Sequence, residues 1–171
     1  MAIRKIITPP DPLLREKSLR VTQVDDDVRA LIRDMFDTMY AAPGIGLAAV
    51  QVGEPLAIIV MDPAGENEEP RPKALINPQI VWKADELREY EEGCLSVPEV
   101  YDKVVRPAEV RVRYLDEQGE EREELFRGME ATIVQHEIDH TRGILFVDYL
   151  GRLKRERYLK KVIKKARLAR P

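Results

Sequence analysis

Residues that bind soft or borderline metal ions are scarce in this sequence. The 171 residues include one cysteine, Cys94, and two histidines, His136 and His140. A single cysteine excludes an internal disulfide framework and fits a reducing compartment, so a cytoplasmic location is expected.

Long apolar runs are absent as well. No segment approaches the roughly 20 apolar residues that span a bilayer, and the apolar stretch near the N-terminus is too short for the core of a signal peptide. Only 6% of the residues are aromatic, whereas 44% are hydrophobic and 35% are charged. This balance suits one globular domain with a sizeable core, and neither a membrane nor DNA is expected as a partner.

Acidic residues are almost missing from the C-terminal end. Residues 151–171 contain ten Lys or Arg and one acid, Glu156, for a net charge of +9. Because the whole chain carries −3, residues 1–150 carry −12. This split predicts a basic C-terminal helix or tail, residues 151–171 of the same domain, with an anionic partner. The alternative is a solvated amphipathic helix that docks partly on the body.

Hydrophobic spacing predicts antiparallel strands with helices gathered after them, which is an α+β fold. The clearest element is a helix that begins at the acidic residues 25–27 and ends near Pro43. Residues 44–53 are expected to form a small-residue loop, and Pro78 to place its strand at an edge or to bend it. The other expected elements are a helical turn over 13–17, strands over 56–61, 74–82, 104–114 and 121–126, an extended segment over 144–149, and helices over 128–143 and 152–168.

Both histidines lie in one short string, QHEIDH (residues 135–140). Side chains at positions i and i+4 of a helix point the same way, which suits two imidazoles on one metal ion. Glu137 would then lie beside the metal and act as a base. The histidines share a helix face with Met129 and Ile133, so this face is expected to point inward, where polar groups need partners. The alternative is a solvated helix face with a nearby salt bridge.

The cysteine lies in a polar string, EGCLS (residues 92–96). A lone cysteine is often a small buried hydrophobic residue. The neighbouring acids Glu91 and Glu92 make this a poor setting for a core residue, which favours a role for Cys94 as a metal ligand.

Three strings, GIGLAAVQ (44–51), EGCLS (92–96) and QHEIDH (135–140), occur in this order. Together they resemble the three motifs of peptide deformylase, and the resemblance covers almost the full length of the chain. It implies small antiparallel sheets packed around a central helix that carries HExxH, with a further helix at the C-terminus. It also implies that residues 1–150 form a catalytic domain that removes the formyl group from the N-terminal formylmethionine of newly synthesised polypeptides.

The resemblance assigns the metal site to Cys94, His136 and His140. The implied cofactor is one divalent ion, typically Fe(II), with Zn(II), Ni(II) or Co(II) also able to occupy the site. Three protein ligands leave a further position for water. Glu137 is implied to take the proton of that water and to pass it to the departing amine.

Substrate contacts are also implied by position in the family. The backbone N–H of Leu95 and the side-chain amide of Gln51 are the implied donors to the oxyanion. Gly44 permits close approach of an extended peptide backbone. This chain has Tyr101 where some members have an Arg, so the peptide contact of that Arg is not carried over. The residues expected to contact the substrate or border the methionine pocket are Ile45, Gly46, Tyr90, Glu92, Met129 and Ile133.

Two further expectations concern the surroundings of the site and the basic tail. Asp139 and Arg106 are candidates to support the metal ligands from behind, with a surface ion pair as the equal alternative. The resemblance implies that the C-terminal helix attaches the enzyme to ribosomes, which are coated with RNA phosphate.

Two other functions remain open from the sequence alone. A zinc peptidase of the HExxH type would take its third ligand after the second histidine, and only Asp148 and Glu156 are available there. An inactive homologue that acts as a metal-bearing binding module would more often have four protein ligands.

Overall fold

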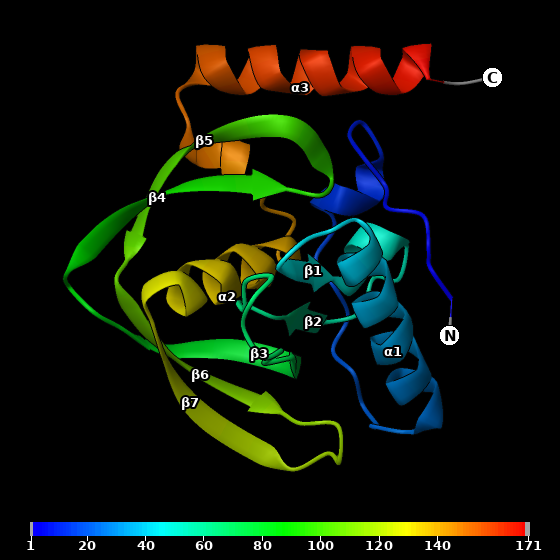
Figure 1. The fold of residues 1–171 in the computed structure, drawn as a ribbon, viewed down its shortest axis with the longest axis vertical. Coiled ribbons are helices and arrows are strands. Elements are labelled where there is room, and N and C mark those ends of the chain that lie inside the picture. The colour runs from blue at the N-terminus through cyan, green and yellow to red at the C-terminus, as the bar shows by residue number, and fades with distance from the viewer. Residues whose placement is uncertain (1, 170–171) are drawn as a thin grey trace.

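The computed structural model describes residues 2–169 and contains two antiparallel sheets with a central helix between them (Figure 1). The α+β fold expected from the sequence is therefore confirmed. The helices are α1 (Asp26–Ala41), α2 (Gly128–His140) and α3 (Arg152–Leu168), with short 3-10 helices η1 (Pro12–Arg15), η2 (Ala49–Val52) and η3 (Phe146–Tyr149). The strands are β1 (Gly46–Ala48), β2 (Ile58–Met61), β3 (Lys73–Lys83), β4 (Leu87–Cys94), β5 (Val97–Pro107), β6 (Glu109–Leu115) and β7 (Glu121–Arg127).

The predicted first helix is confirmed as α1. The carboxylate of Asp25 accepts a hydrogen bond from the Val28 N–H at 3.0 Å, which satisfies one of the free donors at the start of the helix. Leu31, Ile32 and Met35 share the buried face and pack on one side of the larger sheet. The spacing of apolar residues was therefore sufficient to locate this element.

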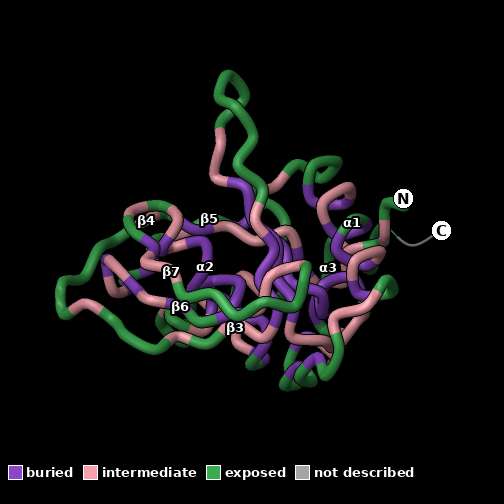
Figure 2. Tube along the Cα trace, turned by 90° about the horizontal axis from the view of Figure 1, so that it is seen from below, coloured by how far each residue is buried: buried purple, intermediate pink, exposed green. Residues whose placement is uncertain are grey.

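The larger sheet has the strand order β1-β2-β3-β6-β7 and is covered on both faces. In β2, Ile58 and Val60 face the core beneath α1, whereas Ile59 and Met61 face the core beneath α2. Because side chains alternate across a strand, burial of both faces requires an unbroken apolar run. Buried residues gather in the middle of the molecule around these elements (Figure 2).

The strand that contains Pro78 bends but does not lie at an edge. β3 pairs with β2 on one side and β6 on the other, and its register shifts between Ile76 and Gln79. Asn77, with a φ of 52°, occupies the irregularity, a left-handed conformation that asparagine tolerates better than most residues. Of the two expected outcomes, an edge position or a bend, the structure has the bend, because a bulge also accommodates proline.

Two segments near the residues expected to form the metal site differ from their predicted structure. Residues 44–53 were expected to form a loop but contain β1 and η2, because Leu47 and the three residues after it are buried in the core. The single strand expected over 104–114 is divided at Ala108 between β5 of the two-stranded sheet and β6 of the five-stranded sheet. Pro107 ends β5, and β4, its partner, was not predicted.

The C-terminal part begins with the central helix. α2 ends at His140, three residues before the expected Gly143, and residues 146–149 form η3 instead of an extended segment. α3 matches its predicted bounds and lies across the two-stranded sheet on the outside of the molecule (Figure 1). Its buried residue is Val162, which joins a core with Val97, Val100 and Phe146. Within residues 2–169, no helix is both long and apolar enough to cross a membrane.

Candidate metal centre

The three residues expected to bind a metal converge in the structure. The candidate ligand atoms of Cys94, His136 and His140 all lie within 4.8 Å of one another. Cys94 Sγ and His140 Nε2 are 3.3 Å apart. A thiolate and an imidazole bound to one tetrahedral ion lie about 3.5 Å apart, given metal–sulfur and metal–nitrogen distances of about 2.3 and 2.0 Å. The residues present therefore fit a divalent metal ion.

Two elements bring these ligands together. Cys94 is the last residue of β4, and a tight turn at residues 95–96 leads into β5. His136 and His140 are one turn apart on α2, with ring centroids separated by 5.1 Å. Both imidazoles are buried, as the sequence predicted for their helix face. Met129 on the same face is half-exposed, because it lies in the first turn of the helix at the rim of the fold.

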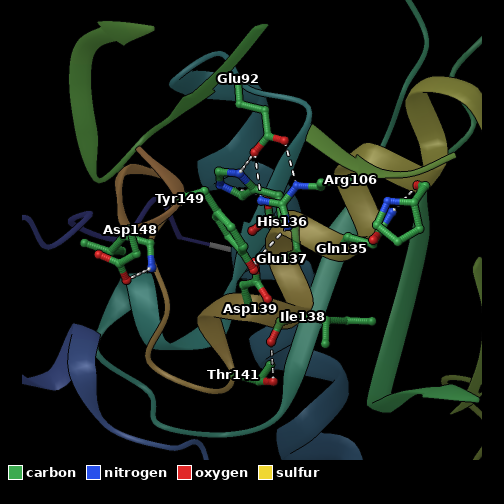
Figure 3. Close-up of polar contacts among 12 residues, drawn as sticks. Glu92, Arg106, Gln135, His136, Glu137, Ile138, Asp139, Thr141, Asp148 and Tyr149 are labelled. Carbon is green, nitrogen blue, oxygen red and sulfur yellow. Dashed lines mark hydrogen bonds and ion pairs between the residues drawn. The ribbon is translucent and has the colours of Figure 1, made fainter. Parts of the chain in front are cut away.

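A buried network of charged residues supports His136 (Figure 3). Its Nδ1 lies 3.0 Å from Glu92 Oε1, and both carboxylate oxygens of Glu92 accept hydrogen bonds from Arg106, at 2.7 and 2.9 Å. Arg106 also donates to Asp139 Oδ2 at 2.8 Å. The side chains of Arg106 and Asp139 are only 5% and 10% exposed, so the alternative of a surface ion pair is excluded.

This network sets the orientation of the His136 ring. Burial opposes ionisation of Glu92, but hydrogen bonds from Arg106 and His136 lower its pKa. Because an ionised carboxylate only accepts hydrogen bonds, His136 donates to it through Nδ1. The other ring nitrogen, Nε2, then faces the two remaining candidate ligands. A carboxylate behind a histidine is the arrangement that fixes the ring of metal ligands in other proteins.

Glu137 lies beside the candidate ligands without a strong partner of its own. Its Oε2 is 3.9 Å from His136 Nε2. Among residues 2–169, its Oε1 is one of the few buried side-chain oxygens with no hydrogen-bond partner. Burial raises the pKa of Glu137 to about 7. A Cβ at Gly46 would lie 2.6 Å from Oε2, so a glycine at this position makes room for the carboxylate.

The electrostatics of the pocket favour a positive charge at its centre. Burial opposes the charged form of His136, yet the neighbouring Glu137, Cys94 and Glu92 raise its pKa well above the ordinary value. Burial lowers the pKa of His140, which keeps that imidazole neutral. A neutral imidazole and a site that attracts cations are both what a metal centre requires.

Gln51 connects the first sequence string with the second. Its Oε1 accepts a hydrogen bond from the Ala48 N–H at 2.9 Å, and its Nε2 donates to Ser96 Oγ at 3.0 Å. The same Nε2 lies 3.5 Å from Cys94 Sγ. Leu95, between Cys94 and Ser96, packs so closely on Gly44 that a Cβ there would lie 2.7 Å from its side chain.

The residues expected to contact substrate occupy two levels of burial. Ile133 is buried and Gly46 lies at the start of β1, next to Glu137. Ile45 and Met129 are half-exposed, and Tyr90 on β4 lies beneath the guanidinium of Arg88. The carboxylate of Glu92 bonds to His136 and Arg106 and does not face open space. Tyr101 lies against Gly93, where a Cβ would be 2.5 Å from its ring.

The ligands required by a peptidase of the HExxH type lie elsewhere. Asp148 forms an ion pair with Arg15 and accepts a hydrogen bond from the Leu145 N–H. Glu156 is paired with Arg152 on the exposed side of α3. Neither carboxylate belongs to the group of side chains within residues 2–169 that could hold a metal.

Three residues of the site were missed by the sequence analysis. Ser96 bonds to Gln51, Phe146 stacks on the His136 ring with centroids 6.0 Å apart, and Tyr149 donates to Asp139. Phe146 and Tyr149 follow the HExxH helix closely along the chain. Because the chain has few aromatic residues, two of them so close to the HExxH string could have indicated that they lie at the site.

The fold and site are those of a metalloenzyme with a candidate mononuclear centre, formed by one cysteine and two histidines beside a buried carboxyl group. The family model described as polypeptide deformylase matches residues 3–156. The chain belongs to this family.

Relatives and solved structures agree with this assignment. The peptide deformylase of Phenylobacterium zucineum is 56% identical over 99% of this chain and 100% of that relative. The one from Maricaulis maris is 57% identical over 96% of this chain and 94% of its own length. The crystal structure of peptide deformylase from Ehrlichia chaffeensis superposes with a TM-score of 0.93 at 42% identity, with 98% of each chain covered. Another crystal structure from that organism is a complex with actinonin.

Proposed function

We propose that this protein hydrolyses the N-formyl group of formylmethionine at the N-terminus of newly synthesised polypeptides. The observation that carries the proposal is the convergence of Cys94, His136 and His140 beside Glu137, whose Oε1 has no hydrogen-bond partner among residues 2–169. This arrangement occurs in a chain that matches the deformylase family over nearly its whole length.

Cys94, His136 and His140 would hold one divalent metal ion. When bound there, the ion would lower the pKa of a water molecule and polarise the formyl carbonyl. We propose Fe(II) as the native ion, with Zn(II), Ni(II) or Co(II) as substitutes. A thiolate is a soft ligand that favours such transition metals over magnesium or calcium.

Glu137 is the proposed general base and acid. Its free Oε1 accepts a proton from water as the water oxygen bonds to the formyl carbon. The carboxylic acid then returns this proton to the nitrogen as the carbon–nitrogen bond breaks, which releases formate and a free amine. The raised pKa of Glu137 suits a group that must both take and give a proton near neutral pH.

The Leu95 N–H and the Gln51 amide are the proposed donors to the oxyanion. Gln51 is held by its Oε1 on the Ala48 N–H and by its Nε2 on Ser96, so its amide needs no reorganisation when charge develops nearby. Both donors belong to the segments that also position Cys94, which ties the oxyanion site to the metal site.

The edge strand β1 is the proposed docking place for the substrate backbone. β1 pairs with β2 on one side only, so an extended peptide can pair with its other side. Ile45, Tyr90, Glu92, Met129 and Ile133 are the residues proposed to border the methionine pocket. A tight site around the metal would admit a formyl hydrogen but exclude the methyl of an acetyl group.

Metal identity should control the lifetime of the enzyme in air. Protein loaded anaerobically with Fe(II), Ni(II) or Zn(II) should release formate from a formyl-Met peptide, and metal-free protein should not. On exposure to air the Fe(II) form should lose activity first, because a redox-active ion and a thiolate share one site. Time courses of formate release measure this. Equal lifetimes of all three forms would contradict iron-linked lability, and no formate release from any form would contradict the proposed function.

We propose that residues 1–150 are the catalytic domain and that residues 151–171 are a basic tail that locates the enzyme in the cell. We propose a cytoplasmic enzyme whose α3 attaches it to ribosomes. Lys154 and Lys165 pair with Asp102 and Glu99 of the body. No ion pair within residues 2–169 includes the exposed residues Lys160, Lys164 or Arg167, whose charges face solvent.

Neutralising these three outward charges should weaken ribosome binding. The Lys160→Gln, Lys164→Gln, Arg167→Gln variant should co-sediment less with ribosomes, and the slope of log affinity against log salt should fall by about 2 to 3, one unit for each lost phosphate contact. Hydrolysis of a short formyl peptide should stay nearly unchanged. Co-sedimentation of wild type and variant at several salt concentrations measures both quantities.

A matched control separates this site from net charge. Arg111→Gln, Arg113→Gln, Arg122→Gln removes the same charge from the larger sheet, where these arginines pair with acids. This control should bind ribosomes more tightly than the tail variant, close to the wild-type level, and retain the wild-type salt slope. Equal losses in both triple variants would contradict a specific role for α3.

A further inference from the structure

One end of the buried network around His136 reaches the surface at Tyr149. Glu92, Arg106 and Asp139 have side chains that are at most 10% exposed. Tyr149 is 50% exposed, although its hydroxyl donates a hydrogen bond to Asp139 Oδ2 at 2.7 Å. Figure 3 shows this tyrosine on the opposite side of Arg106 from Glu92.

Tyr149 makes two contacts with the network. Its hydroxyl shares Asp139 Oδ2 with Arg106, which donates to the same oxygen at 2.8 Å. Its ring lies against the Arg106 guanidinium, 4.8 Å from the ring centroid. An aromatic face against a guanidinium holds it in one orientation and limits its access to water.

The orientation of Arg106 determines the contact behind His136. Arg106 holds Glu92 by two hydrogen bonds, and Glu92 Oε1 lies 3.0 Å from His136 Nδ1. The segment that carries Tyr149 also contacts the histidine directly, because Phe146 of η3 stacks on the His136 ring. Asp148, between the two aromatic residues, is tied to Arg15 and to the Leu145 N–H. η3 is therefore anchored independently of the network.

We propose that Tyr149 is a positioning residue for the metal site, acting through Asp139, Arg106 and Glu92 to hold His136 Nε2 toward the other two ligands. This inference rests on the proposed role of His136 as a metal ligand. Loss of the hydroxyl leaves Asp139 Oδ2 with one donor instead of two. Arg106 can then shift toward Asp139 and away from Glu92, which loosens the support of the His136 ring.

The test compares Tyr149→Phe with Tyr40→Phe in the full-length metal-loaded protein. Tyr40 is a matched control, because it is 47% exposed and its hydroxyl donates to Asp62 Oδ2 at 2.6 Å, in a contact that does not involve the candidate ligands. Each change removes one oxygen and one tyrosine–aspartate hydrogen bond. The readouts are the rate at which a chelator removes Co(II), the Co(II) absorption spectrum, and the melting temperature of the metal-free protein.

Tyr149→Phe should accelerate Co(II) loss by about 3- to 10-fold and shift the Co(II) spectrum. Residues that bond directly to a metal ligand typically change affinity about 10- to 100-fold, and Tyr149 acts from further away. Tyr40→Phe should lose Co(II) at the wild-type rate, although both variants should melt at similarly lowered temperatures. In an Asp139→Asn background the Tyr149→Phe change should add nothing, because its effect passes through that carboxylate.

Three results would overturn the inference. These are Co(II) loss from Tyr149→Phe at the wild-type rate, equal acceleration in both single variants, or an additive effect in the Asp139→Asn background. The proposed function would survive any of these three results if the wild-type protein binds Co(II) tightly and hydrolyses formyl peptides under the same conditions. Failure of the proposed function would instead appear as a wild-type protein that binds no metal or releases no formate.

Discussion

Replacing Glu137 with alanine should leave the metal content unchanged and lower kcat about 10²–10⁴-fold, the usual contribution of a general acid–base residue. Glu137 Oε2 is 3.9 Å from His136 Nε2, but within residues 2–169 its Oε1 has no hydrogen-bond partner, and Glu137 is not one of the three candidate ligands. The ligands should therefore remain in place while the proton acceptor is lost. Metal analysis of the purified protein and formate release under anaerobic conditions measure the two effects.

The fold should tolerate this change. A buried carboxylate without hydrogen-bond partners contributes little to stability, because burial penalises its charge. Glu137→Gln is a useful second variant, since it keeps the side-chain volume but cannot accept a proton from water at neutral pH. Both variants should melt near the wild-type temperature. If either retains more than about a tenth of wild-type kcat, the assignment of Glu137 as the base is wrong.

Replacing Cys94 with alanine should abolish stable metal binding and, with it, activity. Mutation of a residue behind a metal ligand typically costs about 10- to 100-fold in affinity, so removal of a ligand itself should cost more than about 100-fold. Because Cys94 is half-buried at the end of β4, the change removes little packing and the fold should persist. Equilibrium dialysis against Zn(II), with melting temperature as the check on folding, measures the effect.

The control for this prediction is a change at the ligand that a peptidase would use. Glu156→Ala should bind metal as the wild type does, because Glu156 lies on the exposed side of α3 and pairs with Arg152. Asp148→Asn should also retain the metal, at some cost in stability from its contact with Arg15. Retention of metal by Cys94→Ala together with its loss from either carboxylate variant would reverse the assignment of the third ligand.

The sequence predicted those elements whose pattern is local. α1 was located from the helical spacing of its apolar residues. α3 was located from its length and its composition, which are typical of a helix. The expected HExxH helix exists, and its two histidines face inward. The three candidate metal ligands meet as expected, whereas their roles and those of Glu137, Gln51 and Leu95 stay predictions.

The elements that were predicted wrongly are those decided by distant partners. Residues 104–114 read as one strand, but the Ala108 N–H bonds to the Glu86 carbonyl and the chain passes from one sheet to the other there. Residues 146–149 have no helical period, yet they form η3 because Phe146 and Val147 fill the core under α3. Pro78 left an edge strand and a bent strand both open, and the bulge at Asn77 gives the bend, so that β3 remains central.

The sequence by itself determined which chemistry is available: one cysteine thiol, two imidazoles a helical turn apart, a carboxyl group between them, and a basic C-terminal helix. Side-chain type and i to i+4 spacing are local properties that survive without knowledge of the fold. Only the tertiary structure decided that Cys94 reaches His140, 46 residues away along the chain, and that Arg106 is buried between Glu92 and Asp139. These contacts form because buried charged groups and buried backbone polar groups need hydrogen-bond or ionic partners. Tertiary packing brings those partners from distant parts of the chain.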